Sequence, residues 1–182
     1  MSKRPLFRYL LFIIIISTMS GFYSCTTIPK GAVAVSPFYK EKYLGKWYEI
    51  ARIDFRFERG LNNTTATYSL DKNGRIRVVN RGYNSEKGKW KQATGKAKFV
   101  GDENTAMLKV SFFGPFYAGY NVIAIDDQYR YALVCGKNLD YLWILSRQTT
   151  IPPEIKDQYT KLAEAIGYDT KRLLWVKQDN TD

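Results

Sequence analysis

Apolar and polar residues alternate along most of the chain after Tyr43, in short segments separated by turn-forming residues. Alternation with a period of two predicts half-buried strands, and Asp, Asn and Gly mark the turns between them. We predict eight strands, at residues 45–53, 63–70, 75–83, 89–100, 105–113, 119–126, 129–136 and 140–147. Their mostly short connections favour an all-β, antiparallel up-and-down meander. Closed into a barrel, the eight strands leave no open edge and enclose room for one small ligand; an open sandwich is the alternative.

The first predicted strand lies in the stretch YLGKWYEIAR at 43–52 and shows how the two faces should divide. Successive side chains of a strand point to opposite faces. The alternation gives two sets: Trp47, Glu49 and Ala51 on one face, and Tyr48, Ile50 and Arg52 on the other.

Two further segments complete the predicted fold. The connection at 54–62 is the only long one and mixes Phe55, Phe57 and Leu61 with arginines, so we expect it to fold as a lid over the open mouth. After the strands, prolines precede an amphipathic segment at about 153–166 that ends at Gly167, which predicts one C-terminal α-helix packed outside the barrel. A short final strand follows at 173–176.

The N-terminus has the architecture of a secretory signal, with cations near the start, an apolar run at 10–16 and a small and polar stretch before Cys25. The apolar run is too short for a bilayer, which needs about 20 residues. Phe22-Tyr23-Ser24-Cys25 resembles a lipobox, with Phe22 where Leu is usual and Tyr23 in place of a small residue; a plain signal peptide is the alternative. We predict a lipoprotein signal peptide at 1–24, a lipidated tether at 25–42 that starts at the acylated Cys25, and a barrel domain at 43–182.

The chain is basic, with 28 Lys and Arg against 17 Asp and Glu and a net charge of +11. Removal of residues 1–24 takes away three cations and no anions, which leaves +8. In an exported chain such an excess favours an anionic membrane surface over nucleic acid, so we expect no nucleic-acid partner. With Cys25 acylated, Cys135 has no disulfide partner and is expected to be a small buried strand residue.

Catalysis is not expected, because the chain contains no histidine. This removes the usual general base, metal ligand and partner of a nucleophilic serine. Neither cysteine has a second cysteine at metal-ligand spacing, so we predict no metal site and no cofactor. Glu49 is the one carboxylate that alternation turns inward, and we expect it to be a paired structural charge.

Three segments together resemble the signature regions of the lipocalin family: Gly45-Lys46-Trp47-Tyr48, Ile125-Asp126-Asp127-Gln128-Tyr129 and Arg147. Longer stretches resemble the lipoprotein lipocalins of bacterial outer membranes, namely TATYSL at 65–70, KVSFFGPFYAGYNVIAID at 109–126 and YALVCGKNLDYLWILSR at 131–147. The resemblance covers about residues 36–178. It implies architectural roles for Gly45, Trp47, Asp126 and Arg147, with Arg147 packed across Trp47 at the closed end of the barrel.

The resemblance also implies a function: an envelope carrier that binds lysophospholipids or fatty acids in the barrel, for storage or transport. It would be lipid-anchored in the outer membrane, on the periplasmic side. A lipocalin-fold enzyme that acts on a small hydrophobic substrate is the alternative, and the sequence leaves a homodimer open.

Ligand contacts are expected from aromatic residues near the mouth rather than from the signature residues. Such rings supply an apolar lining, and tyrosine adds hydroxyl groups for a polar head. The candidates come from the long loop, from the turn around 112–117 and from the last predicted strand: Phe55, Phe57, Phe112, Phe116, Tyr117, Tyr120, Tyr141 and Trp143.

Overall fold

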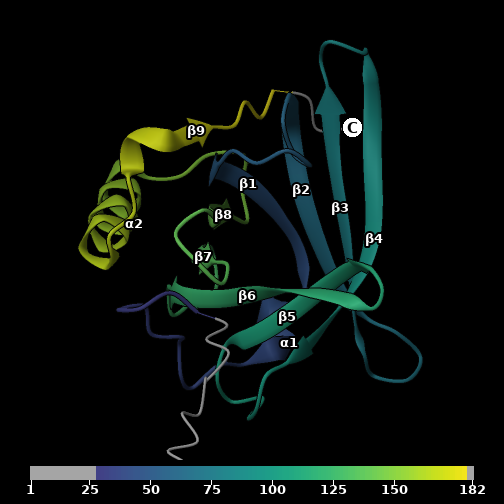
Figure 1. Cartoon of the computed structure of the whole chain (residues 1–182), viewed down its shortest axis with the longest axis vertical. Coiled ribbons are helices and arrows are strands. Elements are labelled where there is room, and N and C mark those ends of the chain that lie inside the picture. Colours follow the sequence, from purple (N-terminus) through teal and green to yellow (C-terminus); the bar gives the residue numbers. More distant parts are fainter. Residues whose placement is uncertain (1–27, 180–182) are drawn as a thin grey trace, which may run out of the picture.

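The computed structural model describes residues 28–179 and forms a closed β-barrel with a helix on its outer side (Figure 1). Cys25 lies outside the described residues, so its acylation stays a prediction. The barrel strands are β1 (Gly45–Ile53), β2 (Leu61–Leu70), β3 (Ile76–Asn84), β4 (Lys89–Phe99), β5 (Met107–Phe113), β6 (Phe116–Ile125), β7 (Tyr131–Cys135) and β8 (Leu142–Ser146). The other elements are α1 (Lys40–Tyr43), α2 (Pro153–Ile166), the 3-10 turn η1 (Thr170–Arg172) and β9 (Leu173–Trp175).

Each barrel strand pairs antiparallel with the next, and β1 pairs with both β8 and β2, which closes the sheet. The eight-stranded up-and-down barrel and the single helix after it are therefore confirmed. Short β9 pairs with the Ala51–Ile53 part of β1, beyond the point where β1 and β2 separate. The C-terminal segment thus fills the gap that this separation would leave.

A β-bulge in β1 changes the expected division of its faces. Glu49 pairs with Leu145 and Ala51 with Ile144, so one extra residue lies between the two pairs. A bulge of this kind reverses the alternation beyond it. Arg52 is consequently buried in the interior beside Glu49, at 2.7 Å, while Ala51 packs in the cluster outside the barrel. The prediction that placed Ala51 with Glu49 and Arg52 on the opposite face is wrong.

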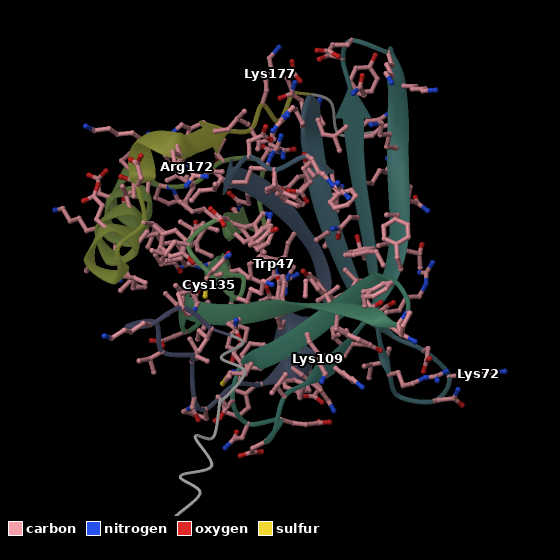
Figure 2. The ribbon with its side chains drawn as sticks, in the orientation of Figure 1. Trp47, Lys72, Lys109, Cys135, Arg172 and Lys177 are labelled. Carbon is pink, nitrogen blue, oxygen red and sulfur yellow. The ribbon has the colours of Figure 1, made fainter. Side chains whose placement is uncertain are left out.

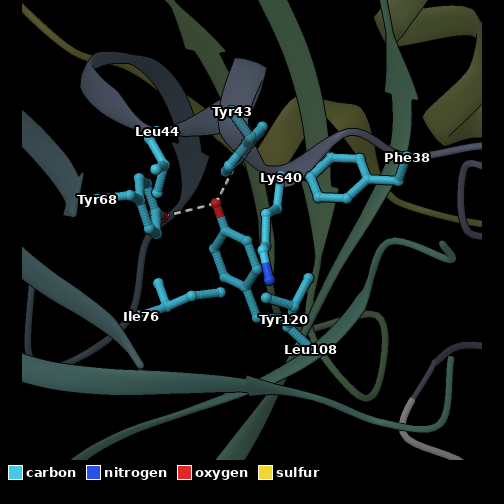
Figure 3. A pocket seen from close by; sticks show the side chains of 8 residues that line it. All are labelled: Phe38, Lys40, Tyr43, Leu44, Tyr68, Ile76, Leu108 and Tyr120. Carbon is cyan, nitrogen blue, oxygen red and sulfur yellow. Dashed lines mark hydrogen bonds between the residues drawn. The ribbon is translucent and has the colours of Figure 1, made fainter. Parts of the chain in front are cut away.

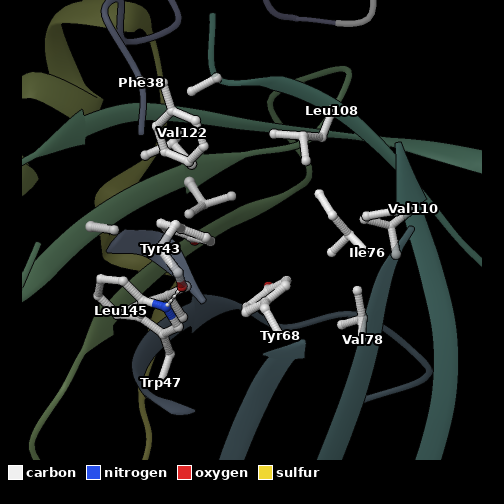
Figure 4. Close-up of a cluster of buried hydrophobic side chains, with 14 of the residues drawn as sticks. Phe38, Tyr43, Trp47, Tyr68, Ile76, Val78, Leu108, Val110, Val122 and Leu145 are labelled. Carbon is white, nitrogen blue, oxygen red and sulfur yellow. Dashed lines mark hydrogen bonds between the residues drawn. The ribbon is translucent and has the colours of Figure 1, made fainter. Parts of the chain in front are cut away.

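Two apolar clusters stabilise the fold. One fills the barrel interior and includes Trp47, Val78, Leu108 and Val122 (Figure 4). The other lies between the sheet and α2, where the hydroxyl of Tyr159 donates to the carbonyl of Tyr131 at 3.0 Å. Helix α2 therefore covers the outside of the barrel, as the spacing of its apolar residues predicts.

Cys135 belongs to the outer cluster (Figure 2). Burial raises the pKa of its thiol to about 12. A thiol with such a pKa has little of the reactive thiolate form at neutral pH. Cys135 is thus a buried strand residue, as expected.

Residues 28–39 form a strap ahead of α1 that runs from the outer cluster, which Ile28 and Ala32 contact, to the interior cluster, which Val35 and Phe38 contact. The N–H of Val35 donates to the carbonyl of Val122 on β6 at 2.9 Å, and the N–H of Ala106 donates to the carbonyl of Val35 at 2.9 Å. Phe38 is buried against the interior cluster. The sequence predicts a tether at 25–42; the described part of that segment packs on the barrel, because its apolar side chains find buried sites there.

The pairing between β4 and β5 is short and leaves one side of the barrel mouth less tightly closed. Register pairs join β4 to β5 over Lys96–Phe99. Residues 91–94, nearer the mouth, are exposed on both faces of β4. Beside them, a β-carbon on Gly95 would lie 2.6 Å from the carbonyl oxygen of Ser111, so only glycine permits this close approach of the two strands.

Candidate functional site

Arg147 and Trp47 close one end of the barrel. The guanidinium carbon of Arg147 lies 3.8 Å from the centre of the Trp47 ring, which is the expected packing. The indole N–H of Trp47 donates to the carbonyl of Tyr43 at 2.8 Å. Arg147 also donates hydrogen bonds of 2.8–3.2 Å to four carbonyl oxygens, those of Lys42, Leu44, Lys46 and Tyr129. One side chain therefore holds three segments of the closed end together.

The other two signature residues support this arrangement. Gly45 has a φ of 98°, and a β-carbon there would lie 3.2 Å from a guanidinium nitrogen of Arg147. Asp126 accepts hydrogen bonds from the N–H groups of Arg130 and Tyr131 and so fixes the turn between β6 and β7. These bonds and the Arg130 cation lower the pKa of Asp126 against the opposing effect of burial. The geometry of all four signature residues is architectural.

Four of the predicted ligand-contact residues meet at the opposite end, beneath the connection between β1 and β2. The Phe55 ring stands nearly perpendicular to those of Tyr141 and Trp143, with ring centres 5.5 and 5.9 Å away. Tyr120 lies 6.4 Å from Trp143 on the interior side. Phe112 also packs on the interior cluster, from β5. An aromatic lining thus surrounds the mouth.

The remaining three predicted contacts lie elsewhere. Phe57 and Phe116 are largely exposed at the rim. Tyr117 lies on the outer face, with the ammonium groups of Lys96, Lys98 and Lys109 at 4.8–6.0 Å from its ring centre. These residues do not line the interior in this structure.

A charged cluster lies beneath the mouth, and only part of it was predicted: Glu49 is inward and paired, as expected, whereas its partner Arg52 was placed on the opposite face. The guanidinium of buried Arg52 binds Glu49 at 2.7 Å and Asp54 at 3.0 Å, and donates to the carbonyls of Glu58 and Leu61. Burial, together with repulsion from Glu58, raises the pKa of Glu49 to about 8 despite the nearby Arg52. Burial also raises the pKa of Glu58. A strict alternation rule does not predict the position of Arg52, because the β-bulge reverses the direction of its side chain. The acidic and basic residues around 49–58 are the sequence signal for this cluster.

Three tyrosine hydroxyls form a chain deeper in the barrel (Figure 3). The hydroxyls of Tyr43 and Tyr68 each lie 2.6 Å from that of Tyr120. Burial holds the pKa of all three well above its usual value, so the hydroxyls stay neutral donors and acceptors. They border a cavity of about 10 Å³ that is also lined by Phe38, Ile76 and Leu108.

This small cavity has space for about one water molecule. A pocket for a drug-sized ligand usually has about 300–1,000 Å³. This cavity is therefore too small for an acyl chain, and a ligand that entered it would displace the residues that line it. Within residues 28–179 no cluster of acidic, cysteine or histidine side chains has the arrangement of a metal site, and no helix has the length and apolar character of a membrane span.

A closed eight-stranded barrel with an aromatic mouth, an arginine across a tryptophan at the other end and a helix on its outer side defines the class of small barrel proteins that carry hydrophobic ligands. Residues 40–178 match the family model described as a lipocalin-like domain. The chain therefore belongs to the lipocalin family.

Bacterial relatives extend this match over most of the chain. The chain is 57% identical over 155 residues to outer membrane lipoprotein Blc of Citrobacter freundii, which covers 85% of this chain and 88% of that protein. It is 47% identical over 169 residues to outer membrane lipoprotein Blc of Vibrio cholerae, and the match covers 92% of this chain and 98% of that protein. At such identities the shared name places this chain among the lipid-anchored proteins of the outer membrane, as the sequence predicts.

Solved structures of low sequence identity share the fold. Insecticyanin from the tobacco hornworm Manduca sexta is 21% identical, with a TM-score of 0.67, over 83% of this chain and 86% of that chain. The amine binding protein of Rhodnius prolixus, in its tryptamine complex, is 18% identical, with a TM-score of 0.59, over 82% of this chain and 86% of that chain. At these identities the likeness concerns the fold alone.

Proposed function

We propose that this lipocalin is an envelope carrier that reversibly binds one lysophospholipid or fatty acid, for storage or transport at the outer membrane. The acyl chain would enter between the aromatic residues of the mouth and extend toward the tyrosine hydroxyls. The polar head would stay at the mouth near exposed cations such as Arg56 and Arg59. The proposal is supported by the lipocalin fold and by the outer membrane lipoprotein names of the bacterial relatives.

The observation that carries the proposal is the way the 54–60 connection lies in the mouth. Phe55 occupies the space beside Tyr141 and Trp143, and Glu58 reaches Trp143 with one hydrogen bond of 3.1 Å. Arg52 also holds this connection, through Asp54 and the carbonyl of Glu58, and the connection carries exposed residues. Displacement of Phe55 would open a path from solvent to the apolar interior, so the connection fits the predicted lid.

Energetics allow an acyl chain to supply the affinity. Burial contributes about 0.8 kcal/mol per methylene, so a chain of about 16 carbons contributes more than about 10 kcal/mol before ordering costs. Micromolar binding needs about −8 kcal/mol. The gross gain exceeds this value by roughly 2 kcal/mol or more, and that difference must offset both the ordering costs and lid displacement.

Native mass spectrometry of residues 26–182, purified from a Gram-negative host, tests the proposal. We expect one co-purified lipid per barrel, and lipid extraction should identify it as a lysophospholipid or a fatty acid. Titration of delipidated protein with such lipids should quench Trp143 fluorescence, and a Trp143→Phe variant identifies the signal from this residue. An empty barrel that neither class of lipid quenches or saturates would refute the proposed function.

A further inference from the structure

Three phenylalanines at the barrel mouth are exposed to solvent. Phe57 in the β1–β2 connection is 58% exposed, and Phe113 and Phe116 at the turn between β5 and β6 are 69% and 79% exposed. Together with Tyr117 we call them the rim patch. Exposure of these aromatic side chains to water does not stabilise the fold, and clusters of exposed apolar side chains mark interaction surfaces.

The members of the rim patch form one continuous surface although two elements supply them. The rings of Phe57 and Phe113 have centres 6.4 Å apart. Phe113 pairs with Phe116 across the turn, and Tyr117 follows Phe116 on the outer face of β6. The patch therefore extends from the mouth onto the outside of the barrel.

Cations flank the rim patch at both of its ends. The guanidinium carbon of Arg56 lies 4.4 Å from the centre of the Phe57 ring. The other end, at Tyr117, is surrounded by Lys96, Lys98 and Lys109. The salt bridges within residues 28–179 involve none of these four cations. Their charges remain available to an anionic partner.

We propose that the rim patch and its four cations dock the barrel on an anionic lipid bilayer, independently of the N-terminal acyl anchor. Tyrosine prefers the depth of the lipid head groups, and phenylalanine side chains enter the boundary between the head groups and the acyl chains. Each nearby Lys or Arg contributes about 1 kcal/mol on an anionic surface. The surface needs no bound ligand, so this docking is separate from the carrier function proposed above.

A second copy of the chain fits the same surface less well. In a symmetric dimer the patch would face itself, which brings the lysines of one subunit toward those of the other. Like charges across an interface disfavour that pairing, whereas the lipid phosphates of an anionic bilayer favour the patch. Charge complementarity thus selects the bilayer.

Vesicle co-sedimentation of residues 26–182, which contain the whole described barrel, tests the docking. We expect binding to phosphatidylcholine vesicles that contain phosphatidylglycerol, much weaker binding to phosphatidylcholine alone, and a loss of binding at high salt. The triple variant Phe57→Ser, Phe113→Ser, Phe116→Ser should lower the partition coefficient about tenfold or more, because it removes three apolar rings from the contact with lipid. Substitution of Lys96, Lys98 and Lys109 by Glu should abolish the preference for anionic vesicles.

Trp175→Ser supplies the matched control. Trp175 is also exposed, at 42%, and also has a cation near its ring, Lys156 at 4.1 Å, but it belongs to β9 on the helix side of the barrel. Its loss should leave vesicle binding unchanged. Equal binding of both vesicle types, or equal losses in the rim variant and the control, would overturn the proposal. A dimer in sedimentation velocity that the rim substitutions dissociate would also overturn it, in favour of a second copy.

Discussion

The indole N–H of Trp143 on β8 donates a hydrogen bond to the Glu58 carboxylate at 3.1 Å. This bond joins the barrel wall to the lid, since Glu58 lies in the connection between β1 and β2. The same indole faces Phe55 and Tyr120. Trp143 therefore serves as a contact of the closed lid and as part of the wall that an acyl chain would touch.

Removal of the lid contact should speed ligand entry. In Glu58→Ala the closed lid loses the hydrogen bond to Trp143, which contributes about 1 kcal/mol at this partly buried position. We expect the association rate of a fluorescent fatty acid, measured by stopped flow, to rise about fivefold. Glu86→Ala, in the exposed turn between β3 and β4, is the control and should not change it. A slower association in Glu58→Ala would show that Glu58 guides the ligand instead.

Truncation of the wall should weaken ligand binding. Trp143→Ala removes the largest ring of the mouth, and we expect acyl affinity to fall about tenfold while the barrel remains folded, because Trp143 packs at the edge of the interior cluster and is not one of its buried members. Isothermal titration with a fatty acid gives the affinity, and circular dichroism verifies the fold. Unchanged affinity in a folded variant would place the acyl chain elsewhere.

Loss of Arg147 should affect stability more than ligand binding. Its contact with Trp47 contributes about 0.5–2 kcal/mol, and hydrogen bonds from a charged donor contribute about 1.5–3 kcal/mol each before competition with water. We expect Arg147→Ala to lower the free energy of unfolding in urea by about 3 kcal/mol, with a change in ligand affinity below threefold. Arg147→Lys retains the charge but not the fork of donors, so it should be intermediate. A variant of normal stability with lost affinity would contradict the architectural role.

The charged cluster should make stability depend on pH. The pKa of Glu49 is raised to about 8 by burial and Glu58, with Arg52 opposing and Asp54 adding to the rise. The native state then holds a proton that the unfolded chain has lost, so the free energy of unfolding falls as pH rises from about 5 to about 8. The slope for one such proton is at most about 1.4 kcal/mol per pH unit. Glu49→Gln should flatten the slope in urea titrations; an unchanged slope would assign the pH dependence to other groups.

Strand positions and the closed end were predictable because they depend on local alternation and on a small set of signature residues. Trp47 and Arg147 meet as expected across the barrel end. The inward position of Arg52 was not predictable, because a single extra residue at a bulge reverses parity and leaves no mark in the pattern. Tertiary packing of Phe38 was missed for a related reason: an irregular segment with prolines has no period, and only the finished barrel offers the site that buries it.

The lining of the mouth was predictable only in part. Residues on strands, such as Tyr120 and Trp143, have directions that alternation assigns. Phe57 and Phe116 lie in or beside turns, where the direction of a side chain depends on the loop conformation, and both point to solvent. The direction of the Glu58 side chain, which points toward Trp143, likewise depends on the loop conformation.

With the predicted acyl anchor at Cys25 and the proposed docking of the rim patch, strand β6 connects two places where the protein would meet a bilayer. The strap lies beside β6 at its Ile125 end, and Ile28 is three residues from Cys25, a reach of about 10 Å (Figure 1). The exposed turn at Phe116 is at the opposite end, roughly 30 Å away along ten residues of strand. Tethering by the acyl chain raises the effective concentration of the turn at the bilayer to about the millimolar range, so even a weak second contact becomes largely occupied. Such two-point attachment lays the barrel on its side, with its opening at the level of the lipids rather than above them.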